Sequence, residues 1–301
     1  MHVSRLDTLP AQELPTEGQR DQPMNEPPSQ PRTIGPDQAA ALMEPLTDLV
    51  VQAGKAILAV NRRAMKVEDK QDGSPVTEAD LAADRIIGDG LARLIPDIAA
   101  LSEERAHLSK PPYRGSFFLI DPLDGTKEFV AGRGEFTVNL ALVTNGTPLL
   151  GIIGAPALGW LWRGLVGQGA ERLRLTEAGA ATPEPIHTRP RPQSGAPWIA
   201  AVSRSHCDAL TEAFIAARPG AVREKLGSAL KFSRVAEGAA DIYPRLAPTS
   251  EWDIAAGHAV VTAAGGKVTD ANGAALRFGE REGSFVVPAF IAWGDPAAML
   301  Y

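Results

Sequence analysis

The spacing of apolar and polar residues predicts two amphipathic helices early in the chain. Apolar residues from Leu46 to Val60 recur every three or four positions, as on one face of a helix, and Pro45 is suited to the first helical position. Thr77-Glu78-Ala79-Asp80 has the form of a capping box and opens a second helix with the same periodicity. Both helices are expected to pack on a sheet.

The following segments have the patterns of β-strands. Phe117–Ile120 is a short apolar strand, and 136–142 alternates apolar and polar residues, which predicts a strand with unlike faces. Asn145-Gly146 is a hairpin-turn signal, so residues 149–155 can return as the partner strand, followed by a third strand at 160–166. The first half therefore predicts helices on an antiparallel-rich sheet.

A proline-rich stretch divides the chain, and strands and helices alternate after it, which indicates a smaller α/β second half. Residues 1–36 are also rich in proline and poor in large apolar side chains, as is typical of a disordered leader. The predicted plan is a leader (1–36), a metal-binding catalytic α+β half (37–182), a linker (183–197) and an α/β half that completes the substrate site (198–301).

Composition and charge exclude several classes of protein. A net charge of −6 argues against a nucleic-acid polymer as partner. The single cysteine, Cys207, excludes an intrachain disulfide framework and a cysteine-rich zinc site. With no transmembrane run and no signal pattern, a cytoplasmic protein is expected. Peripheral contact with the inner membrane and the oligomeric state stay open.

Acidic residues cluster where apolar segments end. Glu103-Glu104 follows one apolar segment, Asp121 and Asp124 follow another, Asp253 opens an apolar helix and Asp80 lies in the capping box. Taken singly, these acids could be a solvated pair, a turn starter, a helix cap and a capping-box acid. Together they form a set of hard oxygen ligands for divalent cations, which suggests metal-assisted phosphoryl chemistry.

In order and spacing, four segments resemble the motifs of the inositol monophosphatase superfamily, from about residue 45 to the end. They are Asp72–Asp80, Ser102–Glu104, Asp121–Thr126 and Trp252–Gly257. Within it, the chain resembles the bacterial 3′(2′),5′-bisphosphate nucleotidase family at Thr126–Phe129, Gly134–Asn139, Ser203–His206, Gly227–Phe232 and Tyr243–Arg245. Ala229 stands where that family often has serine, so a hydroxyl contact is absent there.

The resemblance implies a layered αβαβα sugar-phosphatase-like fold and two or three Mg²⁺ ions. The implied metal ligands are Glu103, Asp121, Asp124, Asp253 and the carbonyl of Leu123. The implied substrate-binding residues are Glu103, Leu123, Asp124, Gly125, Thr126, His206, Ser228, Lys231, Arg245 and Asp253. Either Asp80 with Thr126, or Glu103 with Thr126, is expected to orient and deprotonate the attacking water.

The implied activity is Mg²⁺-dependent hydrolysis of the 3′-phosphate of adenosine 3′,5′-bisphosphate to AMP, and of 3′-phosphoadenylyl sulfate, in sulfur assimilation. The alternative enzyme is an inositol-1-phosphate or broad sugar-phosphate phosphatase with the same metal site. Lys231 and Arg245 favour the nucleotide because they can meet a second phosphate, although each could also be a solvated surface charge. A non-catalytic phosphate-binding protein is the third hypothesis, and the complete acid set speaks against it.

Overall fold

The computed structural model describes residues 31–300 except 63–64, 66, 70–74, 110, 177–178, 181, 205–207 and 219. Arg32–Tyr301 forms one compact unit. The helices are α1 (Pro36–Ala59), α2 (Glu78–Leu94), α3 (Thr126–Val130), α4 (Ala209–Ala216), α5 (Leu230–Ala236) and α6 (Glu251–Ala263), with 3-10 turns η1 (Glu103–Leu108), η2 (Pro156–Leu158) and η3 (Pro296–Leu300). The strands are β1 (Val67–Asp69), β2 (Pro75–Thr77), β3 (Ala99–Ser102), β4 (Ser116–Asp124), β5 (Thr137–Thr144), β6 (Thr147–Ala155), β7 (Trp160–Leu165), β8 (Gly169–Thr176), β9 (Gly179–Ala180), β10 (Glu184–Ile186), β11 (Ile199–Ser203), β12 (Val222–Leu226), β13 (Ile242–Arg245), β14 (Thr249–Ser250), β15 (Lys267–Thr269), β16 (Val286–Val287) and β17 (Phe290–Trp293).

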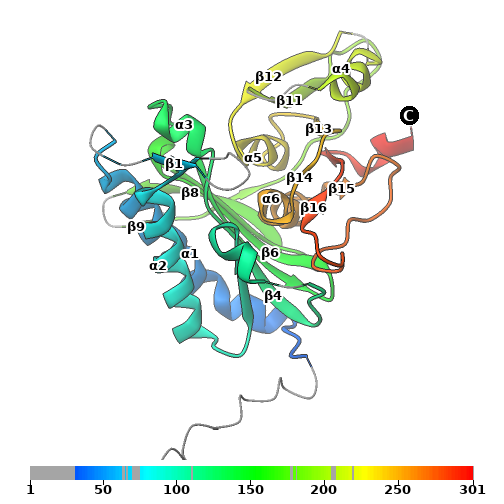
Figure 1. Cartoon of the computed structure of the whole chain (residues 1–301). Helices are drawn as coiled ribbons and strands as arrows, with labels where there is room; N and C mark the ends of the chain where they lie inside the picture. Colours follow the sequence, from blue (N-terminus) through cyan, green and yellow to red (C-terminus); the bar gives the residue numbers. More distant parts are fainter. Residues whose placement is uncertain are drawn as a thin grey trace, which may run out of the picture. The chain divides into compact units, whose positions relative to one another are not determined.

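Five layers make up this unit. Helices α1 and α2 cover one face of an eight-stranded sheet in the order β10-β8-β7-β6-β5-β4-β3, with β9 on β8 (Figure 1). Helices α5 and α6 lie between that sheet and a five-stranded sheet in the order β12-β11-β13-β17-β15, and α4 packs on the second sheet. The predicted layered αβαβα fold is confirmed. None of the helices in the described part of the chain is long and apolar enough to cross a membrane.

Strand directions differ between the two sheets, as predicted. In the large sheet every pairing is antiparallel except that of β3 with β4, and in the small sheet β11 pairs in parallel with both neighbours. The Asn145-Gly146 hairpin joins β5 to β6 as predicted, and both residues have positive φ. The prediction of unlike faces for 136–142 is wrong, because helices cover both faces of the sheet and bury even Thr137 and Asn139.

Helix α1 begins nine residues before the predicted start at Pro45. Pro36 occupies the first turn after the cap residue Gly35, whereas Pro45 lies inside the helix. The chain already packs at Ile34, which is buried and whose N–H donates to Ser116 Oγ at 2.8 Å. The apolar periodicity extends back to Ala39. Because proline is rare inside a helix, the sequence pattern places the helix start at Pro45, too late in the chain. Residues 1–30 of the predicted leader lie outside the described residues.

One core runs through both predicted halves. A single cluster of buried side chains includes Phe117 and Ile153 from the first half and Phe232 and Val260 from the second. The proline-rich stretch 183–197 contains β10, which pairs with β8. The division of the chain into two halves joined by a linker stays a prediction.

Helix α6 packs directly on β6 because Gly151 has no side chain. A Cβ atom at this position would lie 2.2 Å from the carbonyl oxygen of Ala256. This close approach brings the first turn of α6, with Asp253, to the end of β4 that carries Asp121 and Asp124.

Candidate active site

A β-bulge sets the direction of the two aspartates on β4. Asp121 pairs with Asn139 and Asp124 pairs with Thr137, so one extra residue of β4 lies opposite this part of β5. Side chains three positions apart in a regular strand point to opposite faces. With the extra residue both carboxylates lie on one face, and Asp124 Oδ2 accepts from Thr137 Oγ1 at 3.4 Å and from Asn139 Nδ2 at 3.3 Å.

Strand β4 runs through Asp124, so the strand that was predicted to lead into the two aspartates is confirmed. Pro122 lies in the bulge, where a strand tolerates the loss of an N–H donor. The Leu123 N–H donates to Asp121 Oδ1 at 3.1 Å. Gly125 then turns the chain with φ of 95°, and α3 begins at Thr126.

Asp80 and Thr126 are in direct contact. The Thr126 hydroxyl donates to Asp80 Oδ1 at 2.9 Å and also lies 3.2 Å from the carbonyl of Leu123. The other carboxylate oxygen, Asp80 Oδ2, accepts from the N–H and the hydroxyl of Thr77 at 2.8 and 2.6 Å. The predicted capping box of α2 is thereby confirmed, and it holds one oxygen of Asp80 while the other faces Thr126.

Asp253 occupies the same place in α6 that Asp80 occupies in α2. Each is the third residue of its helix and closes a capping box, with Ser250 as the cap residue of α6. Asp253 Oδ2 accepts from Ser250 N at 3.2 Å and from the hydroxyl of Thr249. The alternative that Asp253 is itself the helix cap is wrong, because the helix begins at Glu251.

Three acids from separate elements converge near the bulge. Oxygen atoms of Glu103 on η1, Asp121 on β4 and Asp253 on α6 all lie within 4.8 Å of one another. Burial raises the pKa of Asp121 well above its ordinary value, and the charges of Glu103 and Asp124 raise it further. Burial likewise raises the pKa of Asp124 to about 6, with Asp253 adding to the effect.

This donor set fits a divalent cation such as Mg²⁺. Mg²⁺ prefers hard oxygen ligands and is held by a few carboxylates together with water and substrate phosphate. Like charges crowded in a buried site are unfavourable without a cation. Glu103, Asp121 and Asp253 have this chemistry. Asp124 lies on the same face of β4 as Asp121.

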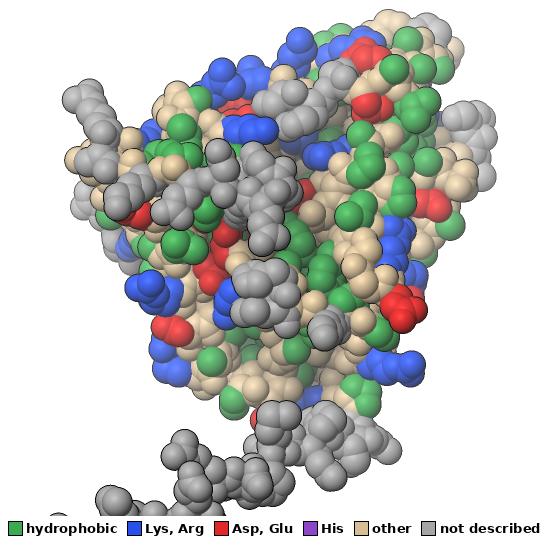
Figure 2. Space-filling model, in the orientation of Figure 1, with side chains coloured by type: hydrophobic (Ala, Val, Ile, Leu, Met, Phe, Trp, Pro, Cys, Tyr) green, Lys and Arg blue, Asp and Glu red, His purple; other side chains and the backbone are tan. Residues whose placement is uncertain are grey.

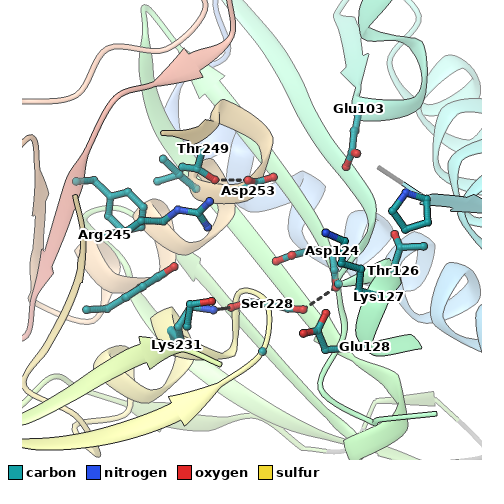
Figure 3. Close-up of a pocket in the computed structure, with 17 residues that line it drawn as sticks. Glu103, Asp124, Thr126, Lys127, Glu128, Ser228, Lys231, Arg245, Thr249 and Asp253 are labelled. Atoms are coloured by element: carbon teal, nitrogen blue, oxygen red, sulfur yellow. Dashed lines mark hydrogen bonds between the residues drawn. The ribbon is translucent and has the colours of Figure 1, made fainter. Parts of the chain in front are cut away.

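A pocket joins these acids to two basic side chains. Figure 3 shows Glu103 and Asp124 on one side of it and Lys231 and Arg245 on the other. Lys231 is buried, its ammonium lies 5.1 Å from the ring centre of Tyr243, and it donates to the carbonyl of Ser228. Burial lowers the pKa of Lys231 to about 8.

The second basic side chain has donors of its own for an anion. Arg245 Nη2 donates to the carbonyl of Pro248 at 3.1 Å. Its Nε is buried and has no hydrogen-bond partner among the described residues. A buried donor of this kind is costly unless a ligand completes it, so Arg245 and Lys231 form the anion-binding side of the pocket.

The structure brings most of the predicted site residues together. Glu103, Asp124, Gly125, Thr126, Ser228, Lys231, Arg245 and Asp253 all line the pocket. Asp80 contacts Thr126, which lines the pocket, and Asp121 lies in the acid cluster with the lining residues Glu103 and Asp253. His206 lies outside the described residues. The hydroxyl of Ser228 donates to two carbonyls, those of Asp124 and Glu135, at 2.7 and 2.9 Å.

The sequence reasoning missed several residues of the pocket. Thr249 lies in the pocket wall and holds Asp253, and the capping-box pattern from Ser250 to Asp253 could have located that helix start. Glu128 and Tyr243 also line the pocket; both lie in segments that carried the resemblance, without an assigned role.

An αβαβα fold whose acid cluster and anion pocket meet at the end of β4 defines the class of layered sugar phosphatases. The chain belongs to the inositol monophosphatase family, whose model matches residues 39–297. Members of this family are magnesium-dependent phosphatases.

Comparison with individual proteins narrows the relationship. The 3′(2′),5′-bisphosphate nucleotidase CysQ of Escherichia coli K12 is 39% identical over 83% of this chain and 98% of its own length. CysQ of Haemophilus influenzae is 31% identical over 82% of this chain and 90% of its own. The crystal structure of CysQ from Bacteroides thetaiotaomicron aligns with a TM-score of 0.69 at 33% identity, covering 84% of this chain and 97% of that one.

Proposed function

We propose that this protein is a magnesium-dependent phosphatase that hydrolyses the 3′-phosphate of adenosine 3′,5′-bisphosphate to AMP and phosphate. The similarity to CysQ proteins from several bacteria supports this substrate. The same site would accept 3′-phosphoadenylyl sulfate, which carries the same 3′-phosphate, so the reaction belongs with sulfur assimilation. We propose that two or three Mg²⁺ ions take part.

One observation carries the choice of substrate. Glu103 and Asp124, two of the acids that fit Mg²⁺, lie across one pocket from Lys231 and Arg245, so a substrate with two anionic groups can engage both sides. A simple inositol monophosphate offers only one such group, and its binding would leave the buried Nε of Arg245 without an anionic partner. The alternative of an inositol-1-phosphate phosphatase is therefore less supported.

Separate residues would bind the metal ions and activate the attacking water. Glu103, Asp121, Asp124, Asp253 and the carbonyl of Leu123 would hold Mg²⁺, which when bound polarises the phosphate and makes water more acidic. The Thr126 hydroxyl can accept a proton from the attacking water as it passes its own proton to Asp80 Oδ1. The hydrogen bond between Thr126 and Asp80 favours this pair over Glu103 with Thr126.

Phosphate binding has its own group of residues. Gly125 and Thr126 begin α3 beside the metal ligands and would contact the 3′-phosphate. Lys231 and Arg245 would bind the 5′-phosphate as charge-assisted donors. His206 is proposed to contact the nucleotide.

A comparison of substrates tests the proposal. We expect kcat/KM to be about a hundredfold higher for adenosine 3′,5′-bisphosphate than for inositol 1-phosphate, because only the bisphosphate has a second phosphate that can form a buried ion pair. Both activities should disappear with EDTA and return with Mg²⁺. Lys231→Met should lower kcat/KM more for the bisphosphate than for inositol 1-phosphate. A preference for inositol 1-phosphate would contradict the proposal.

A further inference from the structure

The loop between β12 and α5 adopts a conformation that needs support. Ser228 has φ of 49°, a left-handed conformation that costs a residue with a side chain about 1 kcal/mol or more. In this conformation its carbonyl accepts from the ammonium of Lys231, and its hydroxyl donates to the carbonyls of Asp124 and Glu135. The loop thus contacts both a proposed metal ligand and the lysine of the anion pocket.

The side chain of Glu135, two residues before β5 of the large sheet, supports this loop. Glu135 Oε2 accepts from the N–H of Gly227 at 2.8 Å. The loop also passes so close that a Cβ atom on Gly227 would lie 2.4 Å from the carbonyl oxygen of Glu135. Only glycine fits there, so the backbone of the loop rests directly on the residue that precedes β5.

Arg204 at the end of β11 holds Glu135 in place. Arg204 Nη2 donates to Glu135 Oε1 at 2.7 Å, and Arg204 Nε donates to Oε2 at 3.1 Å. The same Nη2 donates to the carbonyl of Lys225 on β12 at 2.9 Å. Arg204 therefore joins the ends of β11 and β12 to Glu135, two residues before β5. In the view of Figure 2, Lys and Arg side chains lie along the upper edge of the molecule, near α3 and β12.

We infer that Glu135 is a positioning residue for the second phosphate of the substrate, acting through Gly227 and Ser228 on Lys231. The inference rests on the proposed function. Glu135 keeps the carbonyl of Ser228 directed at the ammonium of Lys231, and the hydroxyl of Ser228 keeps that loop at a fixed distance from Asp124. The chain of hydrogen bonds from Glu135 through Gly227 and Ser228 to Asp124 and Lys231 thereby sets the separation between the metal side and the anion side of the pocket.

The test compares Glu135→Gln on two substrates that differ by one group. Adenosine 3′,5′-bisphosphate carries the second phosphate, and 3′-AMP lacks it. The variant weakens a charge-assisted bond, so we expect KM for the bisphosphate to rise about tenfold with kcat within about twofold of the original protein. For 3′-AMP, both constants should change less than about twofold.

A matched control is Glu212→Gln, which breaks the 2.7 Å ion pair between Glu212 and Arg223 in the same half of the chain, at comparable exposure. It should leave both substrates unaffected. If Glu135→Gln fails to fold by circular dichroism, Arg204→Gln replaces it. That variant keeps the bond from Glu135 to Gly227, so it should show a smaller rise in KM for the bisphosphate only.

The possible failures are distinguishable. If the original protein shows no advantage for the bisphosphate over 3′-AMP and inositol 1-phosphate, both the proposed function and the role of Glu135 fall. If it prefers the bisphosphate and Glu135→Gln changes both substrates equally, or neither, only the positioning role is overturned. A lower KM for the bisphosphate would also overturn it, because Glu135 would then compete with phosphate for Arg204.

Discussion

Replacing Glu251 by Gln should stabilise the protein increasingly as pH rises. Glu251 is the first residue of α6, and its side chain is 0% exposed. Oε2 accepts from Gly279 N at 2.7 Å, whereas Oε1 is buried without a hydrogen-bond partner among the described residues. Burial raises the pKa of Glu251 from 4.5 to about 7. An ionised carboxylate at this position is therefore unfavourable.

The magnitude follows from the linkage between protonation and folding. Because the pKa is higher in the folded state than in the unfolded chain, stability that is fully present below pH 4.5 is lost as pH rises through about 7. At about 1.4 kcal/mol per pH unit, ionisation of Glu251 costs about 3 kcal/mol at pH 8. Gln stays neutral, so its advantage in the free energy of unfolding should grow by about 2.5 kcal/mol between pH 5 and pH 8.

The assay is urea unfolding followed by circular dichroism at pH 5 and pH 8, with EDTA present so that metal binding does not contribute. Glu282→Gln, which changes an exposed carboxylate on the loop beyond Gly279, is the matched control and should shift the free energy of unfolding by less than about 0.5 kcal/mol at either pH. A Glu251→Gln difference that is the same at both pH values would refute the reasoning.

Three further predictions follow from the site and the packing. Asp124→Asn should lower kcat with Mg²⁺ about a hundredfold or more while thermal unfolding stays near normal, and retained turnover would show that the metal assignment is wrong. Because burial lowers the pKa of Lys231 to about 8, kcat/KM for the bisphosphate should fall above that pH, and a profile from about pH 7 to 10 in which Lys231→Met shows the same fall would contradict this. Gly151→Ala places a Cβ 2.2 Å from the carbonyl of Ala256 and should destabilise the protein by about 3 kcal/mol in urea, whereas Gly134→Ala, whose Cβ would meet only ordinary contacts at 3.4 Å, should not.

Local patterns in the sequence were sufficient to predict much of the fold. The capping box at Thr77, the hairpin at Asn145-Gly146 and the helical periodicities each depend on residues that are neighbours in the chain. The start of α1 was misplaced because two prolines, Pro36 and Pro45, carry the same local signal and only packing distinguishes them. Burial of both faces of β5 depends on which helices cover the sheet, and no single strand reveals that.

For the site, residue types were predictable but their contacts were not. The acids at the ends of apolar segments indicated a metal site, and Glu103, Asp121 and Asp253 do converge. The ion pair between Glu135 and Arg204 joins residues far apart in the sequence, and the burial of Lys231 against Tyr243 joins a helix to the strand that follows it. Such contacts follow from tertiary packing, which has no signature in a short window.

The bulge in β4 makes the site sensitive to the length of this segment. Inserting one residue between Asp121 and Asp124 while the bulge remained would turn the side chain of Asp124 to the opposite face from Asp121, even though every acid in the chain remained. A single-residue insertion between Asp121 and Asp124 should therefore abolish activity where many substitutions at Pro122 would be tolerated. Lineages that keep this chemistry are constrained here in residue count more than in residue identity.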